Sequence, residues 1–278
     1  MSAMMHFGGA IVLALVGFAV AATGAAPDPS AAAARVDDDQ ATPAPPAHAP
    51  IEQRHLTTRD GTVVDYALVL PRDFDASKTY PALLALPPGP QTASMVEAGL
   101  DRYWGKQASE RGWIVISPAA PNGVSFYSGS ERLVPELLDA VQSQFKVEGG
   151  KFHLAGASNG GRSAFRVALD HPDRFLSLTV LPGMPPRPED FAMLPSIAKL
   201  PVTMYVGGSD TAWLEQMKRT RDALVRAGGR VTLTVLPNEG HVPPSLDGAV
   251  IMERLDEVRR EIKGIATPND RTGAHSSS

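Results

Sequence analysis

The chain has 278 residues with a formal net charge of −4, and hydrophobic and charged residues make up 43% and 20% of it. These values are typical of a soluble globular protein of one or two domains, and the lack of a basic field disfavours nucleic acid as a partner. The chain contains no cysteine, which excludes disulfide bonds, thiolate catalysis, cysteine-ligated zinc and a lipid-modified N-terminal cysteine.

The first 26 residues carry no charged side chain, and residues 10–22 form an apolar run. This run has the length of the apolar core of a secretory signal peptide and is short for a membrane span of about 20 residues. We therefore expect a cleaved signal peptide over residues 1–26 and export to the periplasm or the extracellular space. An uncleaved membrane anchor is the alternative, because no Lys or Arg precedes the run.

Three further segments follow from composition. Residues 27–50 are rich in Ala and Pro and predict a flexible linker, because they offer too little apolar surface for a core. Residues 265–278 are polar and predict a flexible tail. The intervening residues 51–264 are enough for one α/β domain.

Strands and helices alternate along this domain. The turn signal Asp60-Gly61 predicts a hairpin after His55–Arg59. Periodicity predicts strands at Thr62–Leu70, Ala82–Leu86, Trp113–Ser117, Phe152–Gly156, Leu176–Leu181, Val202–Val206 and Val231–Leu236. It predicts helices at Met95–Arg111, Glu131–Phe145, Gly160–Leu169, Trp213–Ala227 and Leu246–Ile262. Such alternation favours a mostly parallel sheet with helices on both faces, whose chemistry gathers at the carboxyl ends of the strands.

Residues 156–161 read Gly-Ala-Ser-Asn-Gly-Gly, the pattern G-x-S-x-G between a predicted strand and a predicted helix. There the serine occupies a strained turn that projects its hydroxyl from the sheet, and the glycines allow strand and helix to approach closely. A Gly/Ser turn without function is the alternative for the isolated pattern. The flanking elements favour Ser158 as a nucleophile, with the amide of Asn159 at a helix N-terminus that favours negative charge.

A serine nucleophile needs a base, and His241 is the predicted one. It follows a late strand in the loop that begins at Asn238, at the carboxyl edge of the predicted sheet. A surface histidine without function is the alternative. The other histidines lie in the terminal segments, before the hairpin turn, inside a strand or at a helix end: His6, His48, His275, His55, His153 and His171.

The acid that orients this base is predicted to be Asp210, which follows the strand Val202–Val206 through two glycines and a serine. The order Ser158, Asp210, His241 is the one used by folds with a nucleophile elbow. An alternative for Asp210 is a helix-capping role alone. Weaker candidates for the acid are Glu239, Asp173 and Asp190.

Together these features resemble the α/β-hydrolase superfamily over Leu56–Ile262. The closer resemblance is to exported esterases of the polyhydroxybutyrate depolymerase and feruloyl esterase group. It is carried by the segments Tyr66–Pro71, Tyr80–Leu86, Gly112–Pro118 and His171–Phe175, and by Asp210, Gly228-Gly229 and Gly240-His241.

One segment departs from the family. Where the family pattern is close to H-G-x-G-Q-T-A, residues 87–93 read Pro-Pro-Gly-Pro-Gln-Thr-Ala. Proline has no N–H to donate to an oxyanion. The resemblance assigns the two oxyanion donors to the amides of Gly89 and Asn159, in a loop stiffened by prolines.

The resemblance implies hydrolysis of small-molecule or polymeric esters through an acyl-enzyme, with no metal or cofactor. A peptidase or thioesterase of the same superfamily is one alternative, and a catalytically silent binding module is another. Aromatic and Met side chains near the predicted site are weak candidates for a substrate pocket, since such residues more often belong to the core. They are Trp104, Phe126, Tyr127, Met184 and Trp213.

Overall fold

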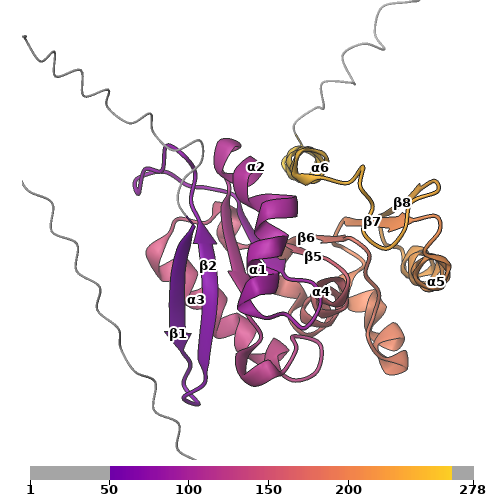
Figure 1. The fold of residues 1–278 in the computed structure, drawn as a ribbon, viewed down its shortest axis with the longest axis horizontal. Coiled ribbons are helices and arrows are strands. Elements are labelled where there is room, and N and C mark those ends of the chain that lie inside the picture. The colour runs from indigo at the N-terminus through magenta and orange to yellow at the C-terminus, as the bar shows by residue number, and fades with distance from the viewer. Residues whose placement is uncertain (1–50, 265–278) are drawn as a thin grey trace, which may run out of the picture. The chain divides into compact units, whose positions relative to one another are not determined.

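The computed structural model describes residues 51–264, so the predicted signal peptide, linker and tail lie outside the described residues. The described residues form one eight-stranded sheet in the order β1-β2-β4-β3-β5-β6-β7-β8 (Figure 1). Its strands are β1 (Glu52–Thr57), β2 (Val63–Val69), β3 (Ala82–Leu86), β4 (Ile114–Pro118), β5 (Phe152–Gly156), β6 (Phe175–Val180), β7 (Val202–Gly207) and β8 (Val231–Leu236).

The sheet is antiparallel only at its first edge. β1 and β2 form the predicted hairpin, and β2 also runs antiparallel to β4. Every later pairing is parallel. In the hairpin turn the Gly61 amide donates to the Thr58 carbonyl, and Gly61 has a φ of 84°, which is why a glycine stands there. The parallel strands place their carboxyl ends at a common edge.

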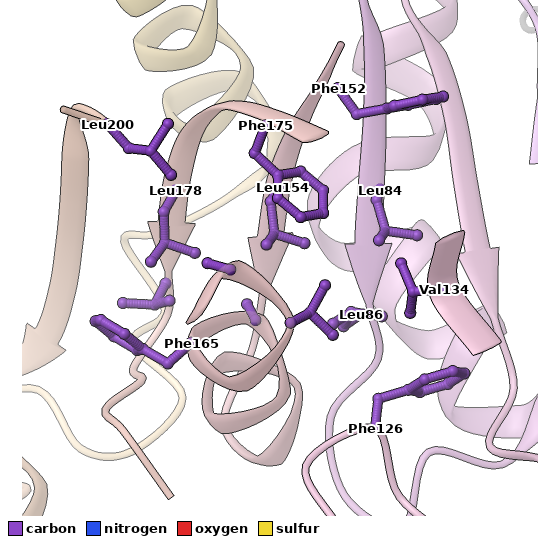
Figure 2. Packing of buried hydrophobic residues seen from close by; sticks show 14 of the residues in the cluster. Leu84, Leu86, Phe126, Val134, Phe152, Leu154, Phe165, Phe175, Leu178 and Leu200 are labelled. Atoms are coloured by element: carbon purple, nitrogen blue, oxygen red, sulfur yellow. The ribbon is translucent and has the colours of Figure 1, made fainter. Parts of the chain in front are cut away.

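Side chains of the central strands alternate between two hydrophobic clusters, as a pleated sheet requires. Figure 2 shows Leu84, Leu154 and Leu178 on neighbouring strands of one face, where they pack with residues such as Phe165 of the next helix. This face is covered by α3 (Val134–Gln144), α4 (Asn159–Asp170) and α5 (Thr211–Arg226). The other face is covered by α1 (Ala93–Gly99), η1 (Leu100–Trp104), α2 (Gly105–Glu110) and α6 (Gly248–Ile262).

The predicted helix Met95–Arg111 is not continuous, and this prediction was wrong in detail. A π-helical turn, η1, separates α1 from α2. This wide turn brings the Leu100 carbonyl so close to Gly105 that a Cβ there would lie 2.9 Å from the oxygen. Leu100, Tyr103 and Trp104 are buried together at a spacing that a regular helix also gives, so the apolar pattern does not reveal the π-turn.

Short 3-10 segments make up the other differences. The helix predicted from Glu131 begins with η3 (Ser130–Leu133), and Pro135 lies in the first turn of α3, as expected. No helix was predicted at η6 (Pro188–Ile197), a ten-residue 3-10 segment that contains Pro195. The remaining 3-10 turns are η2 (Pro121–Gly123), η4 (Glu148–Gly150) and η5 (Pro172–Arg174). Within residues 51–264, no helix has the length and apolarity needed to cross a bilayer.

Candidate active site

Ser158 lies at the sharp turn between β5 and α4. Its φ of 55° and ψ of −117° are unfavourable for a non-glycine residue, and such strain persists only where the surroundings enforce it. The Ser158 amide donates to the Leu181 carbonyl at 3.2 Å, and its carbonyl accepts from the Arg162 amide at 3.1 Å. The loop after β6 and the first turn of α4 therefore hold the strained residue in place.

The glycines around Ser158 are required by packing. A Cβ on Gly156 would overlap the Gly160 carbonyl, and a Cβ on Gly160 would overlap the Leu86 carbonyl at the end of β3. A Cβ on Gly161 would overlap the Pro182 carbonyl. The predicted close approach of strand and helix is thus confirmed, and it is what brings Ser158 to the carboxyl edge of the sheet.

Three side chains from three loops form a hydrogen-bonded chain at this edge. Ser158 Oγ lies 2.8 Å from His241 Nε2, and His241 Nδ1 lies 2.6 Å from Asp210 Oδ2. The Asp210 side chain is 14% exposed and that of His241 is 37% exposed. Asp210 occupies the N-cap position of α5 but makes no side-chain capping bond there, so its carboxylate is available to His241.

The loops that carry Asp210 and His241 are packed directly on each other. The Ser209 amide donates to the Glu239 carbonyl at 2.8 Å, and a Cβ on Gly207 would overlap the Gly240 carbonyl. Glu239 itself accepts from the Ser245 amide at 3.3 Å, within its own loop. The backbone contact therefore fixes the separation of the acid from the imidazole.

Gly89 and Asn159 are neighbours across the turn. The Asn159 side-chain amide donates to the Gly89 carbonyl at 3.0 Å, and Gly89 has a φ of 58°. Neither backbone amide, of Gly89 or of Asn159, donates a hydrogen bond to another of residues 51–264. The free N–H of Asn159, at the start of the helix that follows Ser158, can stabilise negative charge because it has the favourable dipole of α4 behind it.

Gln91 anchors the proline-rich loop, a role that the sequence analysis missed. Its side chain is fully buried and donates to Pro87 O at 3.2 Å and to Ser163 Oγ at 2.9 Å. Its Oε1 accepts from the Phe126 amide at 2.9 Å. Its backbone has a φ of 59°, donates to Pro88 O and accepts from the Ala120 amide. One glutamine thus joins the loop to α4 and to the segment after β4.

Comparisons with known proteins bear on the fold that carries this site. Residues 61–186 match the family model described as "Putative esterase". A solved S-formylglutathione hydrolase from Agrobacterium tumefaciens superposes with a TM-score of 0.60 at 16% identity, covering 76% of this chain and 94% of that one. A ferulic acid esterase superposes with a TM-score of 0.59 at 18% identity, covering 76% and 98%.

The domain has the α/β-hydrolase fold. The predicted fold class and the resemblance to esterases are both confirmed. Among curated proteins, dipeptidyl-peptidase 5 of Porphyromonas gingivalis is 29% identical over 150 residues, which are 48% of this chain and 21% of the peptidase. This chain therefore spans about a fifth of the length of that relative.

The other described histidines lie away from the triad. His55 is exposed on β1. His153 is buried in β5, where Nδ1 lies 2.7 Å from Ser177 Oγ and the ring packs on Trp113. Burial lowers the pKa of His153 to about 4, so it is neutral at physiological pH. His171 is the C-cap residue of α4, and His6, His48 and His275 lie outside the described residues.

Of the weaker candidates for the acid, Asp173 is exposed and Asp190 is fully buried against Arg166 at 2.7 Å. Trp104 and Phe126 are fully buried in the core. The Trp213 ring lies 5.0 Å from the His241 ring. Tyr127 and Met184 are half-buried on loops that follow β4 and β6. Residues 51–264 hold no cluster of side chains suited to a metal ion.

Proposed function

We propose that the protein hydrolyses carboxylic esters, with Ser158 as nucleophile, His241 as general base and acid, and Asp210 as the group that orients His241. The observation that carries the proposal is the continuous hydrogen-bonded chain from Ser158 Oγ through both nitrogens of His241 to Asp210 Oδ2. Its carboxyl-edge location and the esterase family match support it.

In acylation, His241 Nε2 accepts the Ser158 proton while Oγ forms a bond to the ester carbonyl carbon. The amides of Gly89 and Asn159 donate to the oxyanion. The imidazolium gives its proton to the alkoxy oxygen as the C–O bond breaks, so the alcohol leaves neutral. Asp210 stabilises the imidazolium throughout without taking its proton.

In deacylation, His241 accepts a proton from water as the water oxygen bonds to the acyl carbon. The same two amides hold the second oxyanion. The bond to Ser158 Oγ then breaks, His241 returns the proton to Oγ, and the carboxylic acid is released. The overall change is the addition of one water across the ester bond.

Labelling with a fluorophosphonate probe tests the nucleophile. The folded wild-type protein is expected to form one adduct on Ser158 and to hydrolyse a short-chain p-nitrophenyl ester. Ser158→Ala is expected to abolish both. Ser209→Ala is a matched control, since Ser209 is an exposed serine on the neighbouring loop beside Asp210. An unlabelled wild-type protein would favour the silent binding module, and activity in Ser158→Ala would refute the assignment.

A peptidase is the second candidate, because the curated relative over 150 residues is a dipeptidyl peptidase. The same triad can attack an amide, whose leaving amine must be protonated by His241. Parallel kinetics on matched ester, thioester and aminoacyl-amide substrates separate the alternatives. We expect the ester to give the highest kcat/KM, and a higher value for the amide would select the peptidase.

Export remains part of the proposal. It rests on the uncharged first 26 residues and the apolar run at residues 10–22. Cell fractionation with mass spectrometry of the mature N-terminus tests it. A full-length protein in the cytosol would contradict export, and a full-length protein in the membrane fraction would indicate the uncleaved anchor.

A further inference from the structure

Arg162 is a cation beside the candidate site without an acidic partner. No carboxylate of residues 51–264 lies within ion-pair distance of its guanidinium. Its Cζ lies 4.5 Å from the centre of the Tyr127 ring, and Nη2 donates weakly to Pro186 O at 3.4 Å. Its Nε is buried and donates to no acceptor among the described residues.

The next turn of α4 shows the contrast. Arg166 projects from the same outer face and ion-pairs with Asp190 at 2.7 Å, Asp170 at 2.8 Å and Glu131 at 3.6 Å. Three carboxylates thus surround one arginine while Arg162, a single turn away, has none. The positive charge of Arg162 is therefore left without a neutralising carboxylate among residues 51–264.

A second arginine lies beside the first. Arg187 is half-buried, and its Nη2 lies 3.5 Å from the carbonyl oxygen of Tyr127, the residue on which Arg162 stacks. Arg187 also has no ion-pair partner among residues 51–264. Arg162 and Arg187, the Arg162–Arg187 pair, thus both contact Tyr127, one through its ring and the other through its carbonyl oxygen.

This pair lies where three loops from the carboxyl edge meet. The Arg162 amide bonds to the Ser158 carbonyl, and helical side chains lean toward the N-terminus, which here is the Ser158 end. Tyr127 follows Phe126, whose amide bonds to Gln91 of the oxyanion loop. Pro186 belongs to the loop whose Leu181 carbonyl holds the Ser158 amide. Backbone hydrogen bonds thus link Arg162 and the segments around the pair to Ser158 and to Gln91 of the oxyanion loop.

Physical chemistry indicates what such a pair binds. A partly desolvated guanidinium without a counter-charge is unfavourable, and a carboxylate satisfies it through two parallel N–H···O bonds. Stacking on Tyr127 holds the guanidinium plane in one orientation, which lowers the entropy lost when an anion binds. The positive pair also repels cationic substrates.

We propose that the natural ester carries a carboxylate, which Arg162 and Arg187 bind while Ser158 attacks the ester carbonyl. This inference rests on the proposed function and names its substrate class, the half-esters of dicarboxylic acids and the esters of hydroxy acids. The carboxylate takes no part in the bond changes and acts only in binding and orientation.

Paired substrates test the proposal. Monoethyl succinate, glutarate and adipate place a carboxylate at increasing distance from the ester, and 3-acetoxypropionate places it on the alcohol side. Each has a neutral twin of nearly the same shape, in which a primary amide replaces the carboxylate. We expect at least one acid to exceed its amide twin in kcat/KM by roughly 10- to 100-fold, the effect of a charge-assisted hydrogen-bond pair.

Variants assign that preference to the arginines. Arg162→Met and Arg187→Met keep the aliphatic part of the side chain and remove the charge. Each is expected to lower the acid-to-amide ratio of kcat/KM by about tenfold or more, through a higher KM for the acid. Arg162→Lys is expected to restore only part of the preference. Arg226→Met is the control, since Arg226 is exposed at the end of α5.

The outcomes are distinct. Equal kcat/KM for every acid and its twin, or equal losses for both in the arginine variants, would overturn the carboxylate inference and leave ester hydrolysis standing. A folded wild-type protein that hydrolyses neither member of any pair, nor the p-nitrophenyl ester, would instead refute the proposed function.

Discussion

In the proposed mechanism, Asp210 acts through its neighbour. It touches neither the nucleophile nor the oxyanion donors, and its Oδ2 contacts His241 Nδ1 at 2.6 Å. That bond selects the imidazole tautomer whose Nε2 can accept the Ser158 proton.

Asp210→Asn is therefore expected to lower kcat about 10³- to 10⁴-fold with little change in KM, because the amide favours the wrong tautomer and no longer stabilises the imidazolium. Steady-state kinetics on a short-chain ester measure this. Asp173→Asn, at an exposed aspartate, should leave kcat unchanged. A loss of less than tenfold in Asp210→Asn would refute the proposed orienting role.

Gln91 offers a second test at this scale. Gln91→Ala removes two side-chain hydrogen bonds that join the loop of residues 87–93 to Ser163 and Phe126, and a third within the loop, to Pro87. We expect kcat to fall roughly 10- to 100-fold as the Gly89 amide loses its position, with a smaller change in KM. Gln53→Ala, on the exposed side of β1, is the control. An unchanged kcat in folded Gln91→Ala would show that the prolines suffice.

Sequence patterns located Ser158, Asp210 and His241 because their spacing follows from strand order. They did not indicate the contacts by which Gln91 anchors its loop, or the carboxylate-binding role that we propose for Arg162. The contacts of Gln91 span 35 and 72 positions in the chain, and no local period reports such contacts. The retained Gln-Thr-Ala of the family pattern, and an arginine one turn after the nucleophile, were the available signals.

At the scale of elements, the strands from β2 onward were predicted to within a residue, since buried strands are short runs of apolar residues bounded by turns. The first strand, β1, begins three residues before the predicted His55. The helix through Leu100 was predicted as continuous, because a π-turn alters the register without leaving a breaker in the sequence. The segment η6 was missed because its prolines read as loop.

The contact of Gly207 with the Gly240 carbonyl yields a prediction about two loops. Gly207→Ala is expected to separate the Asp210 and His241 loops and to lower kcat by at least about tenfold, because triad geometry tolerates little displacement. Gly240→Ala is the matched control, since a Cβ there meets no atom within 4 Å. Kinetics and thermal unfolding of both variants measure the effect, and equal activities would contradict it.

For the whole molecule, the central position of His153 links stability to pH. Burial lowers its pKa from 6.5 to about 4, so the unfolded chain binds more protons than the native one between these values. Stability therefore rises with pH across this window, and it is lost as the pH falls from 6.5 toward 4, by up to about 3 kcal/mol.

Urea unfolding at pH 5 and pH 7.5 tests this link. His153→Gln is expected to be less stable at pH 7.5, because it disturbs packing on Trp113, but to show a smaller loss on acidification. His55→Gln, at an exposed histidine, should retain the full pH dependence. The same dependence in His153→Gln as in wild type would assign acid sensitivity to other groups.

The loop of residues 87–93 has a consequence for the conditions in which the site can work. It reads Pro-Pro-Gly-Pro-Gln-Thr-Ala and contains no ionisable side chain, whereas the family it resembles places a histidine there. Pyrrolidine rings and the neutral amide of Gln91 set the position of the Gly89 donor. No side chain of this loop gains or loses a proton, so we expect the proposed oxyanion hole to keep its shape in acid. The lower pH limit of activity is then expected to depend on the charge of the His241 imidazole and on the pH at which the domain unfolds.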